Sequence, residues 1–188
     1  LNNTTASNNT AVGKSALGAN TTGTANVGVG NESLLTNTQG SENTGIGVYA
    51  LYSNTTASHN TGIGFAALNS ATTGLQNTSV GLRSLQSLTT GVNNTGIGMM
   101  AGGSNVGNLT TASNNTIVGF KGGQNCTDGQ NTAIGNETNL LGHNHAIVMG
   151  YNTDSVDSYR ITLGRNDGAD RIWNSYTANA SWTRVSDE

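Results

Sequence analysis

The chain has no proline and a single cysteine, and one cysteine can form neither a disulfide framework nor a CxxC metal site within one chain. Charged residues make up only 9% of its 188 residues, and the segment 43–127 carries just Arg83 and Lys121. Such a chain lacks the basic patch with which proteins bind nucleic acid. It also lacks an apolar run long enough to span a bilayer. We therefore expect no nucleic-acid partner and no membrane insertion.

Gly, Asn and Thr together dominate the sequence. Disordered chains are usually rich in charge and proline, and this chain has little or none of either. Because aromatic residues and long aliphatics are few, a monomer has little apolar surface to offset the entropy of ordering its backbone. Cys126, without a second cysteine, is interpreted as a small packing residue.

A regular repeat, seventeen positions long, explains the composition. Five consecutive units occupy 9–25, 26–42, 43–59, 60–76 and 77–93. Each unit has Val or Ile followed by Gly at its fourth and fifth positions, and Leu at its ninth. We predict that the Val/Ile and Leu rows form the core and that the glycines form coil corners. With the first pair of the next unit, these structural residues are Val12, Val29, Ile46, Ile63, Val80, Ile97; Gly13, Gly30, Gly47, Gly64, Gly81, Gly98; and Leu17, Leu34, Leu51, Leu68, Leu85.

The repeat loosens towards the C-terminus. The unit that starts at Asn94 is longer than the others and the unit from Asn115 is shorter, and Gly102 and Gly123 stand where Leu is expected. We therefore divide the chain into regular repeats at 1–98, degenerate repeats at 99–169 and a C-terminal cap at 170–188. The start, "LNNTTASN", reads like the end of a repeat, so we expect a fragment of a longer protein.

Short strands fit the units better than helices, because two small apolar clusters separated by Gly, Asn and Thr do not follow a 3.6-residue period. The chain contains no Asn-Gly hairpin signal, so coiling in one direction is favoured over hairpins. We predict all-β coils of two or three short strands each, with Asn and Gly at left-handed corners, stacked about 4.7 Å apart. A lone stack buries little apolar surface, so we expect a homotrimer in which the Val/Ile and Leu rows pack together.

The units "NTGIGVYAL", "NTGIGFAAL" and "NTSVGLRSL", joined by "TTG" or "TTA", resemble repeats in tail fibres and tailspikes of tailed bacteriophages. They are similar, more loosely, to the β-roll heads of trimeric autotransporter adhesins. The ending "DRIWNSYTANASWTRVSDE" resembles the junction before the intramolecular chaperone of phage fibres, which trimerises the fibre and then cleaves itself off before a serine. That resemblance implies Ser186 as a cleavage junction, with the chaperone itself absent.

The sequence offers few residues for chemistry. Ser186 lacks a nearby base and oxyanion site, so we expect no enzyme activity in this chain. His143 and His145 would point the same way on a strand, and three chains would bring six imidazoles together at a metal ion. The alternative interpretation is a polar turn, "GHNHA", without any cofactor. Trp173, Tyr176 and Trp182 would either stack on a sugar or cover the end of the core.

These observations favour a structural part of a phage tail fibre in the virion, forming a trimeric shaft or tip. Its expected partners are itself, other tail proteins and a host surface receptor, either a polysaccharide or an outer-membrane component. The alternative is the head of a bacterial adhesin at the cell surface. A depolymerising tailspike needs paired carboxylates, which the units from 43 to 127 lack. We expect receptor contacts in the insertion at 102–114, because loops on a rigid scaffold often carry recognition.

Overall fold

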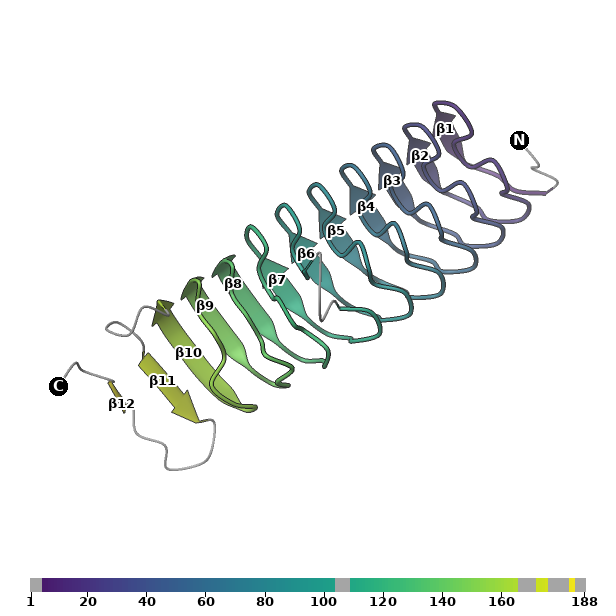
Figure 1. Ribbon diagram of the computed structural model, residues 1–188. Coiled ribbons are helices and arrows are strands. Elements are labelled where there is room, and N and C mark those ends of the chain that lie inside the picture. The colour runs from purple at the N-terminus through teal and green to yellow at the C-terminus, as the bar shows by residue number, and fades with distance from the viewer. Residues whose placement is uncertain (1–4, 104–108, 166–171, 176–182, 185–188) are drawn as a thin grey trace.

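The computed structural model describes residues 5–103, 109–165, 172–175 and 183–184. Figure 1 shows coils stacked along one axis, with their strands side by side in one sheet. The described residues contain no helix, so the all-β solenoid predicted from the repeat is confirmed. The strands are β1 (Thr10–Val12), β2 (Val27–Val29), β3 (Thr44–Ile46), β4 (Thr61–Ile63), β5 (Thr78–Val80), β6 (Thr95–Ile97), β7 (Thr116–Val118), β8 (Thr132–Asn136), β9 (Ile147–Tyr151), β10 (Arg160–Arg165), β11 (Ile172–Ser175) and β12 (Thr183–Arg184).

Strands β1 to β10 pair in parallel and in chain order, each with the equivalent residues of the next coil. Ile46, for example, pairs with Ile63, and Ile63 pairs with Val80. The stacking passes from β6 to β7 across the change in repeat length, so the regular and degenerate repeats share one sheet. After β10 the direction reverses, and β11 and β12 extend the sheet with antiparallel pairs.

Each regular coil contains one three-residue strand, not the two or three predicted. Its other sides are turns, and these also hydrogen-bond to the next coil; Leu51 N, for example, donates to Ala67 O at 3.0 Å. Glycine takes a left-handed corner as predicted: Gly47 has φ 131°, and a Cβ there would lie 2.5 Å from Gly64 O. Asparagine does so too at Asn93 and Asn114, although the asparagine that opens each coil does not, and residues such as Tyr49 and Leu51 also have left-handed backbone.

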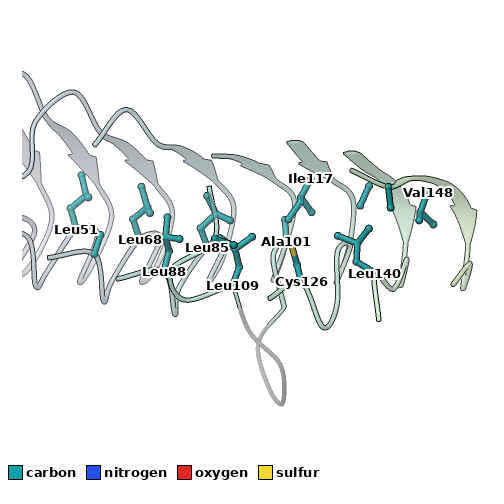
Figure 2. Close-up of a cluster of buried hydrophobic side chains, with 14 of the residues drawn as sticks. Leu51, Leu68, Leu85, Leu88, Ala101, Leu109, Ile117, Cys126, Leu140 and Val148 are labelled. Carbon is teal, nitrogen blue, oxygen red and sulfur yellow. The ribbon is translucent and has the colours of Figure 1, made fainter. Parts of the chain in front are cut away.

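The core lies inside each coil, between the strand and the turn that faces it. All five repeated leucines are at most 1% exposed, which confirms their predicted place in the core; they are Leu17, Leu34, Leu51, Leu68 and Leu85. Opposite them, the middle residue of the strand is usually glycine. A Cβ at Gly62 would lie 3.2 Å from Leu51 Cγ, so glycine leaves the leucine its space. Figure 2 shows Leu51, Leu68 and Leu85 following one another along the axis.

The Val/Ile row is not part of this core. The prediction that it forms one core with the leucines was wrong within the chain, and its predicted burial between chains stays a prediction. The middle residue of each strand faces inwards, so the next residue, the Val or Ile, faces out. Val12 is 57% exposed, Ile46 38%, Ile63 37% and Ile97 42%, while Val29 and Val80 are half-buried. A leucine core shared between chains was also wrong, because each chain buries its own leucines.

A ladder of buried asparagines runs beside the leucines, where the repeat had suggested only turns. Asn60 shows its pattern: its backbone N donates to Asn43 Oδ1 at 3.0 Å, and its Nδ2 donates to Gly74 O at 2.8 Å. Asn77 N in turn donates to Asn60 Oδ1 at 2.9 Å. The same contacts recur along the stack, and the ladder asparagines from the second coil on are at most 1% exposed: Asn26, Asn43, Asn60, Asn77, Asn94, Asn115 and Asn131. Polar side chains therefore fill much of the interior, and those of the ladder are hydrogen-bonded, as buried polar groups must be.

The core packing changes near residue 100. After it, a large residue stands on the strand and a small one in the facing turn, the reverse of the earlier coils. Ile117 takes the inward strand position that glycine holds in earlier coils, and Gly123 takes the leucine position. A Cβ at Gly123 would lie 2.7 Å from Ile117 Cδ1, so the isoleucine occupies the space of the missing leucine. In the coil between, both positions are glycine, Gly96 and Gly102, and a Cβ at either would lie within 2.7 Å of a Leu85 side-chain carbon.

Candidate functional surface

One uncharged apolar row runs along the outer face of the sheet from β1 to β10. It consists of the fourth residue of each coil, and each member pairs with the next: Val12, Val29, Ile46, Ile63, Val80, Ile97, Val118, Ile134, Met149 and Leu163. Six of these residues are at least 37% exposed in the single chain. We call this set the outer row. A continuous exposed apolar patch of this kind marks a site of interaction.

A second row flanks the outer row, two residues further along each coil. Its members are Lys14, Asn31, Val48, Phe65, Leu82, Met99, Phe120, Asn136, Tyr151 and Arg165. We call this set the flanking row. Its middle is apolar, and its only charged residues lie at its two ends. Val48, Phe65, Leu82 and Met99 are each about two-fifths exposed, which widens the apolar face beside the outer row.

An aromatic cluster lies over three neighbouring coils in the middle of the solenoid. The ring of Tyr49 meets those of Tyr52 and Phe65 edge to face, with centroids 5.8 and 6.0 Å apart. The guanidinium of Arg83 lies 6.0 Å from the Phe65 ring centroid. Aromatic faces with a cation and hydroxyls beside them can stack on a sugar ring and bind its polar groups. The insertion at 102–114, in which contacts were predicted, lies partly outside the described residues.

His143 and His145 lie in a bend before β9, not on a strand, and each contacts a residue of the following coil. His143 Nδ1 lies 2.7 Å from Ser155 Oγ. The His145 ring stacks on Tyr159 with centroids 4.5 Å apart, and its Nδ1 is buried without a hydrogen-bond partner. Within the described part of the chain, no three His, Cys, Asp or Glu side chains gather where they could hold a metal ion. The predicted metal site across three chains stays a prediction.

The contact between His143 and Ser155 has the residue types of a base and a nucleophile, and nothing in the sequence indicated it. Ser155 is 2% exposed, and its Oγ donates to Leu140 O at 2.7 Å. The Ser155 hydroxyl proton therefore lies in the hydrogen bond to Leu140 O. His143 must then donate a hydrogen bond to the serine oxygen instead of accepting one from it. A nucleophile needs the opposite arrangement and access to substrate. The pair joins two coils and is not arranged for attack.

Cys126 is fully buried beside the ladder, as its interpretation as a packing residue predicts. Burial raises the pKa of its thiol to about 12; Asn131 opposes this with a weak hydrogen bond, and the charge of Asp128 adds to it. The thiol is thus neutral and inaccessible. Ser186, Tyr176 and Trp182 lie outside the described residues, and Trp173 belongs to β11. No helix in the described ranges is long and apolar enough to cross a membrane.

The outer row is the main feature that the sequence analysis misassigned, although the signal was present. Strands β1 to β6 have the pattern of Thr or Val, then Ala, Gly or Ser, then Val or Ile, and alternate residues of a strand face opposite sides. A glycine beside a buried leucine marks the inward side, and that places Val and Ile outside. Comparison with protein-family models, curated proteins and solved structures finds no match to the chain.

Proposed function

We propose that the chain is a structural component of a bacteriophage tail fibre, forming a stiff homotrimeric shaft or tip that contacts the host surface. In this proposal it acts by holding its shape and not by catalysis. Its partners are two further copies of itself, the neighbouring tail proteins, and a receptor on the host cell. It belongs to the virion and works outside the cell.

The observation that carries this proposal is the unbroken ladder through all ten parallel strands. Strand pairs, turn-to-turn hydrogen bonds and the asparagine ladder each tie every coil to the next, from Asn26 to Asn131. Threonine side chains add another series: Thr38 Oγ1 donates to Thr55 O at 3.1 Å, and Thr55 Oγ1 donates to Thr72 O at 3.1 Å. A rod with such dense contacts between neighbours resists bending, which is what a shaft requires.

A homotrimer fits the distribution of apolar surface. Each chain buries its own leucine core without a partner. The outer row, in contrast, leaves apolar side chains exposed along the length of the sheet. Exposed surface on this scale is costly in water, at ~25 cal/mol for each Å² left uncovered. Association of identical rods would remove it from water.

Of the described surface, the aromatic cluster best suits contact with the host receptor, which is either a polysaccharide or an outer-membrane component. Tyr49, Tyr52 and Phe65 gather in a chain with only 5% aromatic residues, and Arg83 adds a cation. Replacing Tyr49 and Phe65 by Ala should weaken binding to host cells. Phe120 with Lys121 offers the matched control, since it has the same ring and cation pairing without tyrosines, so Phe120→Ala should leave binding intact.

The alternative is the head of a trimeric bacterial adhesin, which would use the same rigid trimer at a cell surface. Immunogold labelling with an antibody raised against this chain separates the two. We expect gold on the tail fibres of purified virions and none on uninfected cells. Gold found only on the bacterial surface would contradict the tail-fibre proposal and support the adhesin instead. Purified chain should also run as a trimer on an SDS gel until it is boiled, and a folded monomer would contradict both.

A further inference from the structure

The outer row has the properties of a seam between copies of this chain. Eight members, from Val12 to Ile134, are β-branched, and such side chains are stiff at χ1. A different exposed row is polar; its residues are Thr22, Gln39, Thr56, Thr73, Thr90 and Thr111. The rod thus has an apolar face along the outer row and a polar row on another side.

The length and spacing of the outer row restrict what can cover it. Nine strand spacings of about 4.8 Å make it about 43 Å long. With the flanking row, apart from Phe65 of the aromatic cluster, it has ten large apolar residues that are at least 37% exposed. At roughly 50–100 Å² each these leave several hundred Å² uncovered, the scale of the ~800 Å² that each partner contributes to a standard interface. A partner must carry matching side chains at the same spacing, and a second copy of this chain has that spacing by construction.

The charge pattern also fits contact between identical residues. Copies related by an axis along the rod bring each coil against the same coil of the other chains, so any charge on the seam would meet its own sign. The outer row has no charged residue in its ten coils, and the flanking row has only Lys14 and Arg165, at its ends. A seam to an unrelated partner would have no need of this neutrality.

We propose that the outer row is the trimer seam: three parallel copies in register turn their Val/Ile rows towards a common axis. This inference rests on the proposed homotrimer and adds which face forms it. The leucine row takes no part, because each chain buries it alone. The threonine row and the edge with the aromatic cluster face outwards, available for contact with other molecules.

The first test places a charge on the seam. Ile63→Glu with Ile97→Glu changes two exposed positions, so the coil interior is untouched. The matched control is Thr73→Glu with Thr111→Glu, in the same two coils on the polar row. By light scattering we expect trimers for wild type and control, and loss of the trimer for the Ile variant at an unchanged circular dichroism spectrum.

A second test does not depend on disrupting the assembly. Ile63→Cys should give a dimer-sized band on a non-reducing denaturing gel after mild oxidation, since two of the three cysteines at the axis can pair. Thr73→Cys should give none. Wild type should form no cross-link, because its one cysteine, Cys126, is buried. If the Glu variant fails to fold, this cross-link decides the question.

The outcomes separate the two proposals. A monomeric wild type would overturn the homotrimer and the seam together. A trimeric wild type whose Ile variant is equally trimeric and equally heat-resistant would overturn the seam alone, as would a trimer in which Thr73→Cys cross-links and Ile63→Cys does not.

Discussion

At the scale of single residues, the ladder asparagines are as much part of the core as the leucines. Asn60 is fully buried, and its side chain binds the backbone of both its own coil and the next. We expect Asn60→Ala to lower the free energy of unfolding by about 2–4 kcal/mol, because Gly74 O and Asn77 N lose their buried partner. Denaturation in urea, followed by circular dichroism, measures this.

Thr73→Ala is the control for Asn60→Ala, since Thr73 lies in the same coil on the exposed polar row. It should change the free energy of unfolding by less than about 0.5 kcal/mol. If the two substitutions have equal effects, the ladder hydrogen bonds add no net stability. They would then only replace the hydrogen bonds that the asparagine makes with water in the unfolded chain.

Cys126 makes stability depend on pH in a defined direction. Burial raises its pKa from 9.0 to about 12 in the folded chain, so between these values the unfolded chain releases the thiol proton and the folded chain keeps it. The unfolded state then binds fewer protons, and the free energy of unfolding falls as pH rises, by up to ~1.4 kcal/mol per unit. Well below pH 9 both states keep the proton and the effect vanishes.

The measurement compares wild type with Cys126→Ser, whose hydroxyl does not titrate in this range. The stability advantage of wild type over the variant should shrink by about 2 kcal/mol between pH 9 and 10.5. The difference between the two proteins cancels the contributions of all the groups that they share. A constant difference across this range would show that the thiol is free to ionise in the folded protein.

At the scale of the coil, the sequence predicted the repeat length, the strand type and the leucine row, because spacing alone determines them. It did not predict the number of strands per coil. Turns such as Tyr49–Leu51 hydrogen-bond between coils as strands do but have left-handed backbone at Tyr49 and Leu51, for which these residue types give no signal. It also assigned Asn60 to a turn, because asparagine is common in turns and its ladder partner lies in the next coil, far along the chain.

The exchange between Ile117 and Gly123 gives a test of how the coil interior is filled. Gly123→Leu alone should destabilise by about 1–3 kcal/mol, because the new side chain meets Ile117. The backbone itself permits leucine: Gly123 has φ 67°, and Leu68 has φ 50° at the equivalent place. Adding Ile117→Gly restores the arrangement of the regular coils and should recover more than half of the loss.

Unfolding of the two single variants and the double variant forms a cycle that isolates the coupling between the positions. Ile117→Gly alone should also destabilise, since it leaves a cavity against Gly123. Strictly additive losses in the double variant would mean that the two side chains do not share one space, contrary to the packing in Figure 2, where Ile117 lies among the core residues.

At the scale of the whole molecule, the sequence indicated a rod but not the contacts that its candidate residues make between coils. His143 and His145 are engaged with Ser155 and Tyr159 within the chain, contacts that join neighbouring coils and have no sequence signature. The aromatic cluster was missed for a related reason. Tyr49, Phe65 and Arg83 are far apart in sequence and become neighbours only because successive coils stack in register.

The scarcity of charge predicts how the whole rod responds to salt. The described ion pairs, such as Glu137 with Lys121 and Asp157 with Arg160, are surface contacts worth at most ~1 kcal/mol each. Screening them should move the thermal midpoint by less than about 3 °C between roughly 0.05 M and 1 M NaCl. Sodium sulfate should raise the midpoint instead, because its exclusion from the surface strengthens apolar burial in the core and at the seam. A midpoint that falls steeply in NaCl would mean that ion pairs hold the coils together, and the ladders and the outer row would then carry less of the stability than their burial implies.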